Sequence, residues 1–315
     1  MDEVRLSVVT VSWNTGPHLM ECVTSVLSAP GVDELILVSH ENPPATMTTL
    51  HDLASQNDKF TLIDTGSNLG FAKGCNIGVD QASHELVLFL NPDAVLIPGA
   101  ASRLKASAQS LTRRPWIIGA RTINADGSEQ RGARRGELTP LSAFIGFLGL
   151  RRFFPNLRDI HRENEDAPDA MYPIPTVSGA AMMMRRDDYL KVGGFDERYF
   201  LHVEDIDICR TVRDNDGQVW FEPRANILHY GRTSRSSPLN VETHKALGFV
   251  KYFWRFYPGP LQRFLTMLMI PMIYGAIWSR LGWLSVFARV KSFFKRRKVR
   301  ARYRRMQNKH SNKSS

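Results

Sequence analysis

The stretch LVLFLNPDA (residues 86–94) decides the fold of this chain. Five apolar residues come first, and Asn91-Pro92-Asp93 ends the run. A short apolar run bounded by turn-forming residues predicts a strand buried on both faces, as in a parallel sheet. Asp93 therefore follows a buried strand directly. A carboxylate in that position can hold a divalent cation, and the alternative is a turn or helix-capping aspartate beside proline.

Strand-like and helix-like segments alternate on the N-terminal side of this stretch. Strands are expected at residues 6–13, 34–39 and 60–64, and helices at residues 18–27, 45–57 and 72–82. This alternation predicts an α/β fold with a Rossmann-like, doubly wound, mostly parallel sheet. Such sheets bind ligands outside the carboxyl ends of their strands. The polar side chains at those ends are Asn14, His40, Asn68 and Asp93.

The chain beyond residue 96 is less regular. Residues 116–120 and 180–184 have the composition of strands, whereas residues 125–173 are rich in loops. Arg131, Arg134 and Arg135 lie close together in this loop-rich part.

A glycine-bearing turn leads into the helix expected at residues 72–82. Its pattern is Asn68-x-Gly70-x-x-Lys73-Gly74-x-Asn76. Backbone N–H groups and a lysine at a helix start favour phosphate binding. The pattern is neither a Walker sequence nor GxGxxG, so an ordinary turn with a surface lysine is the alternative.

Three carboxylates follow an aromatic run in GGFDERYFLHVEDIDIC (residues 193–209). Glu204, Asp205 and Asp207 are costly to desolvate unless a cation, an arginine or a polar substrate compensates their charge. On a helix that starts here, Glu204 and Asp205 point in different directions. One can then act as a base while the other fixes a substrate hydroxyl. The alternative is an acidic first turn favoured by the helix dipole.

His229 ends an apolar run in ILHYGRTS (residues 227–234). A single histidine is more often structural than a ligand, but together with Asp93 it offers nitrogen and oxygen donors that suit Mn²⁺ better than Mg²⁺. Arg232 and Arg235 follow within six residues. They can meet a diphosphate, and surface arginines are the alternative.

The positive charge of the chain is concentrated at its C-terminus. The formal net charge is +10, but residues 280–315 hold 13 Lys and Arg and no Asp or Glu, leaving 28 basic against 31 acidic residues elsewhere. Such a tail meets an anionic surface, either lipid or nucleic acid. Residues 264–279 carry no charge, but the run is short and contains Pro271. Aromatic residues then alternate with basic ones, which favours a segment lying at a membrane surface.

The cysteines and the N-terminus indicate a reducing compartment. Cys22, Cys75 and Cys209 are widely spaced, which predicts neither a disulfide framework nor a zinc site. A strand-like run begins within the first few residues, and no basic segment followed by an apolar one precedes it. We therefore expect no secretory signal.

Several of these segments, in this order, resemble the family 2 inverting glycosyltransferases with a GT-A fold. The resemblance is strongest to rhamnosyltransferase-like members of bacterial polysaccharide assembly, and it extends from about residue 5 to about residue 257. The segments that carry it are SVVTVSWN, NLGFAKGCNIG, LVLFLNPDA, VSGAAMMMRR, GGFDERYFLHVEDIDIC and ILHYGRTS. Each is weak alone, and the ordered set is specific.

The resemblance implies a role for each candidate residue. Asp93 corresponds to the last carboxylate of the family's DxD motif, Asn91 replaces the first, and His229 completes a site for Mg²⁺ or Mn²⁺. Because one carboxylate replaces two, the dependence on metal is left open. Asp205 corresponds to the catalytic base, with Glu204 beside it. The expected substrate-binding residues are Thr10, Asn14, His40, Asn68, Gly70, Lys73, Asn76, Asn91 and Arg232.

The resemblance also implies how the chain is organised and what it meets. Residues 1–95 would bind the nucleotide sugar, residues 96–258 would complete the same domain with the acceptor and catalytic side, and residues 259–315 would form a membrane-associated helical, basic extension. The donor would be a nucleoside diphosphate sugar, with dTDP-rhamnose favoured and UDP-sugars open. The acceptor would be a glycan or a polyprenyl-diphosphate-linked saccharide, at the cytoplasmic face of the inner membrane. No nucleic acid is expected as a partner.

Three other readings are open on sequence alone. A sugar nucleotidyltransferase shares the sheet type, but it would want a glycine-rich first loop with a basic residue, and NTGPH (residues 14–18) has one glycine and no Lys or Arg. A nucleic-acid-binding protein would use the basic tail but has no need of the carboxylates. An inactive glycosyltransferase-like protein would not respond to a change at Asp205.

Overall fold

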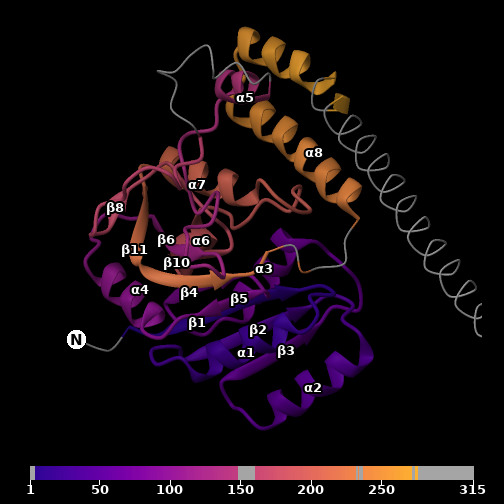
Figure 1. Ribbon diagram of the computed structural model, residues 1–315, viewed down its shortest axis with the longest axis vertical. Coiled ribbons are helices and arrows are strands. Elements are labelled where there is room, and N and C mark those ends of the chain that lie inside the picture. Colours follow the sequence, from indigo (N-terminus) through magenta and orange to yellow (C-terminus); the bar gives the residue numbers. More distant parts are fainter. Residues whose placement is uncertain (1–3, 148–159, 232, 234–236, 272–273, 276–315) are drawn as a thin grey trace, which may run out of the picture.

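The computed structural model describes residues 4–147, 160–231, 233, 237–271 and 274–275. The N-terminal part of the chain alternates strands and helices as predicted (Figure 1). Three of the four predicted strands have the predicted bounds, and the first ends one residue earlier. The elements are β1 (Leu6–Ser12), α1 (His18–Ser28), β2 (Glu34–Ser39), α2 (Pro44–Ser55), β3 (Phe60–Asp64), α3 (Phe71–Gln81), β4 (Leu86–Leu90) and β5 (Ala94–Leu96).

The second part of the chain adds further strands and helices to the elements that the structure describes. They are α4 (Ala100–Gln109), β6 (Trp116–Ile123), β7 (Arg134–Arg135), α5 (Pro140–Phe147), β8 (Tyr172–Pro173), β9 (Thr176–Val177), β10 (Ala181–Arg185), α6 (Arg186–Lys191), α7 (Glu204–Asp214), β11 (Gln218–His229) and α8 (Pro238–Phe256).

One central sheet joins both parts of the chain. Its strand order is β3-β2-β1-β4-β10-β6-β11-β5, with β8 paired to β11, and β7 and β9 form a separate small sheet. The four strands from β3 to β4 are parallel, which confirms the doubly wound half. β10 lies antiparallel between β4 and β6, and β5 lies antiparallel to β11. The carboxyl ends of β1, β2, β3 and β4 therefore share one edge, beside β5 and the end of β11.

The long strand β11 was not predicted from the sequence. Its pairing with β6 shifts register between Glu222 and Asn226, around Pro223. A bulge of this kind interrupts the alternation of side chains, and proline normally argues against a central strand. The strand continues past the bulge and ends at His229, where it pairs with β5.

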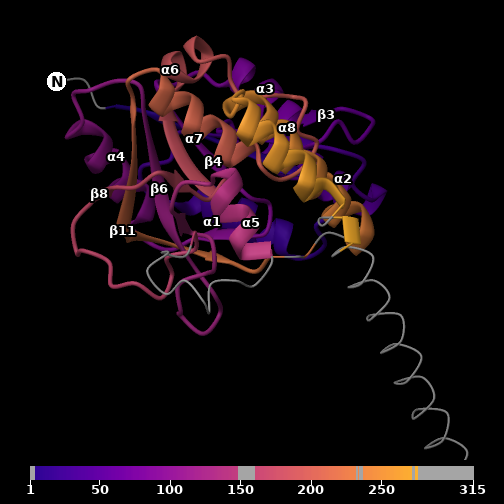
Figure 2. The same cartoon turned by 90° about the horizontal axis from the view of Figure 1, so that it is seen from above.

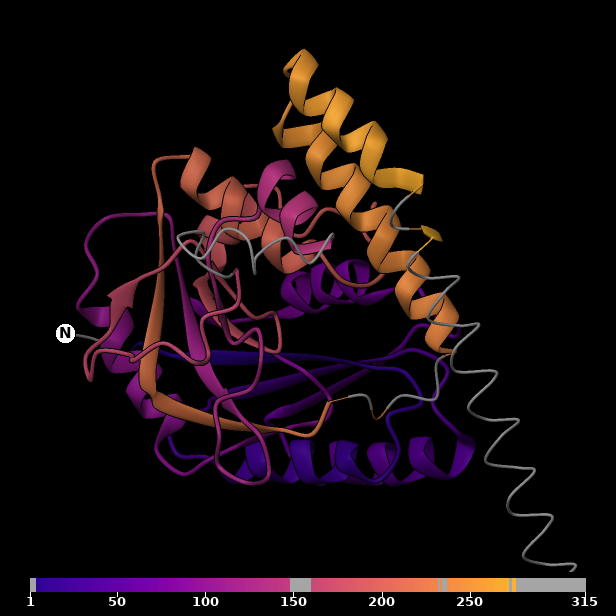
Figure 3. The same ribbon diagram turned by 45° about the horizontal axis from the view of Figure 1, so that its top comes forward.

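Apolar side chains cover both faces of the sheet. Leu6 and Val8 of β1 pack with α1 and α4 on one face, while Val9 and Val11 pack with α3 on the other. Figure 3 shows helices on both sides of the strands. Burial on both faces explains why these strands read as continuous apolar runs.

A third apolar cluster joins α5, α7 and α8 at one end of the molecule (Figures 1 and 2). Ile206 of α7 and Phe253 of α8 belong to it, together with Met269 from a helix at residues 260–271. No helix among the described residues is long and apolar enough to cross a membrane. The basic tail at residues 280–315 lies outside the described residues.

Candidate active site

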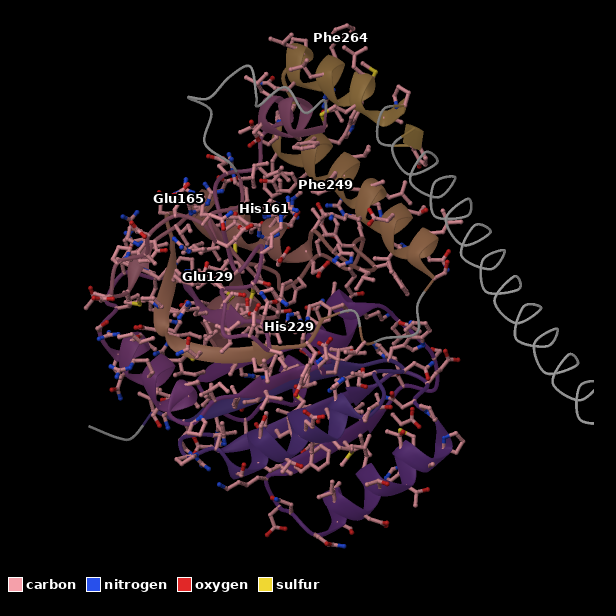
Figure 4. All side chains as sticks on the ribbon, in the orientation of Figure 1. Glu129, His161, Glu165, His229, Phe249 and Phe264 are labelled. Carbon is pink, nitrogen blue, oxygen red and sulfur yellow. The ribbon has the colours of Figure 1, made fainter. Side chains whose placement is uncertain are left out.

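Asp93 and His229 meet at the carboxyl edge of the sheet. Asp93 follows β4, and His229 ends β11, where its backbone pairs with Ala94. His229 Nε2 lies 3.1 Å from Asp93 Oδ1, and the Thr233 hydroxyl donates a hydrogen bond of 2.9 Å to Asp93 Oδ2. Figure 4 shows His229 near the middle of the molecule. Burial alone would raise the pKa of Asp93, but the hydrogen bonds and charge of its partners outweigh it and lower the pKa.

Gln130 sets which nitrogen of His229 faces Asp93. Gln130 Nε2 donates to the backbone carbonyl of His229 at 3.1 Å, which turns Gln130 Oε1 toward His229 Nδ1. Nδ1 therefore carries a hydrogen and donates it to Gln130. In the neutral ring, Nε2 then has its lone pair directed at Asp93 Oδ1 and at Asn91 Nδ2, which is 3.2 Å away.

These donors fit a divalent cation. Two electron-rich atoms, Nε2 of His229 and Oδ1 of Asp93, face each other and favour a positive charge between them, either a proton or a metal ion. Neighbouring ligands of an octahedral ion with bonds of about 2.1 Å lie about 3 Å apart, close to the spacing here. Imidazole and carboxylate together suit Mn²⁺. Among the described residues no group of three or more His, Cys, Asp and Glu could hold a metal, so the remaining ligands would come from substrate and water.

Asp205 occupies the first turn of α7 and forms an ion pair with Arg135 of β7. Arg135 Nη2 donates to Asp205 Oδ2, and the Gly179 N–H donates to the same oxygen at 3.0 Å. The N–H of Ile206 donates to Oδ1 at 2.8 Å. Burial acts to raise the pKa of Asp205, but the charge of Arg135 and these hydrogen bonds lower it. Asp205 is thus an ionised carboxylate held in one orientation.

Glu204 lies beside Asp205 in an opposite electrostatic situation. Its side chain is buried, and Oε2 has no hydrogen-bond partner among the described residues. Burial, followed by the charge of Asp205, raises the pKa of Glu204 to about 8. Glu204 is therefore mostly protonated at neutral pH, whereas its neighbour is charged.

Asp207, the third carboxylate of the cluster, holds elements together. Its Oδ2 accepts a hydrogen bond of 2.8 Å from Tyr199, and its Oδ1 accepts one of 2.8 Å from Arg255 of α8. Both of these partners come from outside α7, and the Thr211 hydroxyl of α7 adds a longer hydrogen bond of 3.4 Å to Oδ1. Arg255 lies 48 positions away from Asp207 along the chain, so no local sequence pattern indicates this contact.

A strained turn directs Glu204 and Asp205 into the site. His202 and Val203 have φ angles of +67° and +75°, a region that β-branched residues rarely adopt. Val203 is packed against Gly248 of α8, where an added Cβ would lie 2.8 Å from Val203 Cγ2. Phe200 stacks on His244 of α8 with ring centroids 4.6 Å apart. Such conformations persist where the surrounding structure enforces them, and they gather at functional sites.

A short turn connects the two groups of residues. The Asn91 N–H donates to the carbonyl of Ala180 at 2.9 Å, and the Gly179 N–H donates to Asp205. Asn91 also contacts His229. The Asp93–His229 pair and Asp205 thus lie on either side of residues 179–180 and belong to one site.

The turns that follow β1 and β2 are held together by Asn42, which the sequence did not single out. Asn42 Oδ1 accepts hydrogen bonds from the Ser12 hydroxyl and the Asn14 N–H, and its Nδ2 donates to the Ser12 carbonyl and the Ser39 hydroxyl. These bonds tie the ends of β1 and β2 together. Asn14 adopts a φ of +48° there and is half-buried at the strand end, as expected.

Thr10 and His40 do not present their side chains to a ligand. Thr10 is fully buried on the face of β1 covered by α1, because alternate residues of a strand point to opposite faces. His40 is 1% exposed and bonds to Thr65 and to the Gly70 carbonyl. It supports the turn before α3, so the expected direct contacts of these two residues are corrected to structural roles.

The glycine turn has a structural partner in the aromatic run. Asn68 Oδ1 accepts the Gly70 N–H at 3.0 Å, and Gly70 has a φ of +87°. A Cβ on Gly70 would lie 2.7 Å from the Phe200 carbonyl oxygen, which accepts the Phe71 N–H. The turn thereby attaches the start of α3 to the segment before α7.

Lys73 and Asn76, two other residues of the glycine-bearing pattern, have different surroundings. Lys73 is exposed in the first turn of α3, where a ligand could reach it. The side-chain amide of Asn76 is hydrogen-bonded to the Phe195 backbone, Tyr189 and Glu197. Its expected contact with substrate stays a prediction, and its partners lie more than a hundred residues away in sequence, so no local pattern indicates them. Arg232 lies outside the described residues.

A mostly parallel α/β sheet with Asp93 and His229 at its carboxyl edge, and the ion-paired Asp205 linked to them through one turn, is the arrangement expected of a glycosyltransferase. The sequence profile of Glycosyl transferase family 2 matches residues 7–193. The chain belongs to this family.

Two relatives have established names. The N-acetylglucosaminyl-diphospho-decaprenol L-rhamnosyltransferase of Mycobacterium tuberculosis H37Rv is 27% identical over 238 residues, which cover 71% of this chain and 76% of the relative. The low-salt glycan biosynthesis hexosyltransferase Agl10 of Haloferax volcanii is 25% identical over 215 residues, covering 67% of this chain and 62% of the relative. Both are glycosyltransferases by name.

Solved structures share the fold at low sequence identity. GalNAc-T7 with UDP, GalNAc and Mn²⁺ has a TM-score of 0.59 and 16% identity, covering 80% of this chain and about half (48%) of that one. The mannosyltransferase PcManGT from Pyrobaculum calidifontis with GDP-Man and Mn²⁺ has a TM-score of 0.54 and 14% identity, covering 88% and 75%. Both support the GT-A architecture.

Proposed function

We propose that this enzyme transfers rhamnose from a nucleoside diphosphate donor, with dTDP-rhamnose favoured, to a hydroxyl of a glycan or a polyprenyl-diphosphate-linked saccharide in cell-surface polysaccharide synthesis. The observation that carries the proposal is the turn at residues 179–180, which hydrogen-bonds to Asp205 through Gly179 and, through Ala180, to Asn91, a neighbour of His229. A site for the diphosphate and a base for the acceptor are the two parts that inverting transfer requires. The name of the mycobacterial relative supports the sugar and the lipid-linked acceptor.

The donor side is formed by the sheet edge. Asp93 and His229 would hold a divalent cation, which when bound offsets the negative charge that gathers on the leaving diphosphate. Asn91 orients His229, and Lys73 is exposed at the start of α3 where a phosphate is attracted. The turns at residues 12–14 and 39–42 form the floor for the nucleoside.

The acceptor side is formed by the start of α7. Asp205 would take the proton of the acceptor hydroxyl as its oxygen attacks the anomeric carbon. The bond from that carbon to the diphosphate breaks in the same step, and the leaving group keeps the electron pair. One displacement inverts the anomeric centre. Oδ2 of Asp205 already accepts two hydrogen bonds, so Oδ1 is the oxygen with room for the acceptor proton.

The proposal includes peripheral attachment to the cytoplasmic face of the plasma membrane. Leu261, Phe264, Met267 and Leu268 are exposed and share one face of the helix at residues 260–271, whereas Thr266 and Met269 on its other face are buried. Phe264 lies on the outermost described helix (Figure 4). An exposed apolar stripe followed by 13 basic residues favours an anionic lipid surface.

A donor screen tests the chemistry. The purified full chain is incubated with dTDP-rhamnose, UDP-sugars and GDP-mannose in Mg²⁺, Mn²⁺ or chelator, and release of the nucleoside diphosphate is measured. We expect dTDP-rhamnose to turn over fastest, with at least a tenfold loss in chelator and in Asp93→Asn. The exposed Asp80→Asn is the matched control and should retain the rate.

Two results would contradict the proposed donor or the proposed cation. Turnover of another donor without any for dTDP-rhamnose would overturn the donor, and an unchanged rate in chelator would overturn the cation. Release of pyrophosphate from a sugar phosphate and a nucleoside triphosphate would indicate a nucleotidyltransferase instead.

A further inference from the structure

The Arg135 side chain is nearly enclosed beside Asp205, at the start of α7. Both side chains are 14% exposed, and they form an ion pair between β7 and α7. The same Nη2 also donates to the Val177 carbonyl of β9 at 2.9 Å. Arg135 Nη2 therefore contacts both the small sheet and the Asp205 carboxylate, which is 70 residues away from Arg135 in sequence.

The small sheet of β7 and β9 holds the Arg135 guanidinium in place. Arg135 pairs with Thr176 in the β7–β9 ladder, and the next residues of that strand lead to Gly179, which donates to Asp205. Arg135 Nε is buried and has no hydrogen-bond partner among the described residues. A buried donor left unsatisfied is costly, so packing alone does not explain why an arginine is enclosed here.

The neighbouring Arg134 shows what a purely structural arginine looks like in this strand. Arg134 is paired with Glu129 at 2.7 Å, bonds to Tyr172 at 3.0 Å and to the Glu165 carbonyl, and points away from Asp205. The two adjacent arginines alternate across β7, as successive residues of a strand do. One anchors the loop-rich region and the other reaches the carboxylate.

We propose that Arg135 is the positioning residue for the catalytic base: it holds Asp205 by Oδ2 and leaves Oδ1 for the acceptor hydroxyl. This rests on the proposed role of Asp205 as the base. Arg135 does not itself touch the acceptor proton. It acts through Asp205, because it binds Oδ2 while Oδ1 is the oxygen that takes the proton.

The other charged groups around Asp205 do not replace Arg135. His202 and Glu204 flank it on its own segment, and Lys245 and Glu242 of α8 lie beyond His202. His202 is exposed at the surface, but desolvation by its neighbours and the charge of Lys245 lower the pKa of its ring to about 4, so this ring is neutral. Glu204 is mostly protonated at neutral pH. Arg135 is thus the cation in direct contact with Asp205 among the described residues.

The pH profile of transfer separates this role from a structural one. A base must be deprotonated, so kcat/KM falls on the acid side as Asp205 is protonated. Removing the guanidinium charge raises the pKa of Asp205, since an adjacent opposite charge had lowered it. In Arg135→Gln we expect the acid limb to move upward by at least one pH unit, with the donor KM within threefold. Arg135→Lys keeps the charge and should keep the limb near that of the parent enzyme, with a lower kcat.

Controls keep the result interpretable. Arg134→Gln removes the neighbouring ion pair and should leave the acid limb in place, whatever it does to stability. If Arg135→Gln has too little activity for a profile, guanidinium ion is added to Arg135→Ala. Recovery of at least tenfold in kcat supports the proposal, and no recovery overturns it.

Asp205→Asn distinguishes failure of this inference from failure of the proposed function. If Asp205→Asn abolishes transfer while a folded Arg135→Gln keeps the parent acid limb, Arg135 does not position the base. If Asp205→Asn transfers at the parent rate, the base itself is wrongly placed and the inference falls with it.

Discussion

Three carboxylates within one helical turn have three different chemistries. Asp205 is ion-paired and has a lowered pKa, Glu204 is buried and has its pKa raised to about 8, and Asp207 is bound to Tyr199 and Arg255. The sequence shows the three as one acidic cluster. Burial, charge and partners separate them, and only the ionised, partly exposed Asp205 is suited to accept a proton at neutral pH.

The raised pKa of Glu204 predicts a dependence of stability on pH. Its ordinary value is 4.5 and its folded value is about 8. Between these values the unfolded chain is ionised at Glu204 while the folded chain is not, so folding loses stability as the pH rises. The loss has a slope of up to about 1.4 kcal/mol per pH unit. It is absent below about pH 4.5 and complete above about pH 8.

Glu204→Gln should remove this loss. Because the amide is neutral at every pH, the variant should gain stability over the parent between pH 5 and pH 8, as measured by urea unfolding. Transfer at pH 7 should stay within about fivefold, since the parent side chain is already mostly neutral. The exposed Glu41→Gln is the control and should give no such gain. A hundredfold loss of transfer with unchanged stability would instead identify Glu204 as the base.

At the residue level, the sequence predicted the parts of the site that sit directly at element ends. Asp93 follows a buried strand and His229 ends another, so position along the chain was informative. Arg135, Gln130 and Asn42 were not predicted as site residues, because their roles depend on partners 28 to 99 positions away. Arg135 had been noted only as part of a basic run.

Three residues expected to bind substrate have other surroundings in the structure. Thr10, His40 and Asn76 carry the polar atoms that a binding residue needs, and Thr10 and Asn76 lie in segments that carry the family resemblance. The side chain of Thr10 points from its strand into the core, and the side chains of His40 and Asn76 are hydrogen-bonded to other parts of the chain. Asn76 saturates its amide with Tyr189, Phe195 and Glu197, which no local pattern reveals.

At the scale of elements, parallel strands were the most predictable part. β2, β3 and β4 match the predicted bounds because strands buried on both faces leave uninterrupted apolar runs. β11 escaped prediction because a bulge around Pro223 breaks its pattern. The entry to α7 also escaped it, because the left-handed turn at His202 and Val203 is imposed by packing against α8.

The helix at residues 260–271 predicts binding to lipid. The full chain should sediment with anionic vesicles of phosphatidylglycerol and phosphatidylcholine more strongly than with phosphatidylcholine alone, and less so as salt is raised. The double variant Leu261→Ser, Phe264→Ser removes two exposed apolar side chains, which are 68% and 53% exposed. At up to about 1.5–3 kcal/mol for each fully inserted side chain, binding should weaken at least tenfold.

Leu190→Ser is the matched control, because Leu190 is 44% exposed on α6, outside the stripe. Equal binding by the control and the double variant would contradict a lipid-docking stripe. A concentration-dependent dimer that the double variant abolishes, without vesicle binding, would indicate a second copy of the chain as the partner instead.

At the scale of the whole molecule, one continuous sheet brings together residues from both halves of the chain. Asp93 comes from the parallel half, His229 from the last strand, and Asp205 from the helix between them in sequence. The turn at residues 179–180 lies between the proposed donor and acceptor sides and bonds to each. This arrangement predicts that the two sides can be impaired separately.

We propose that Asp205 acts on the acceptor and not on the donor. Asp205→Asn is compared with the parent enzyme in two assays, the calorimetric Kd for the nucleotide sugar and the rate of transfer to acceptor. We expect a Kd within about threefold of the parent and a transfer rate lowered by about 10²–10⁴-fold, the usual contribution of a general base. Transfer at the parent rate, or loss of donor binding as large as the loss of transfer, would contradict it.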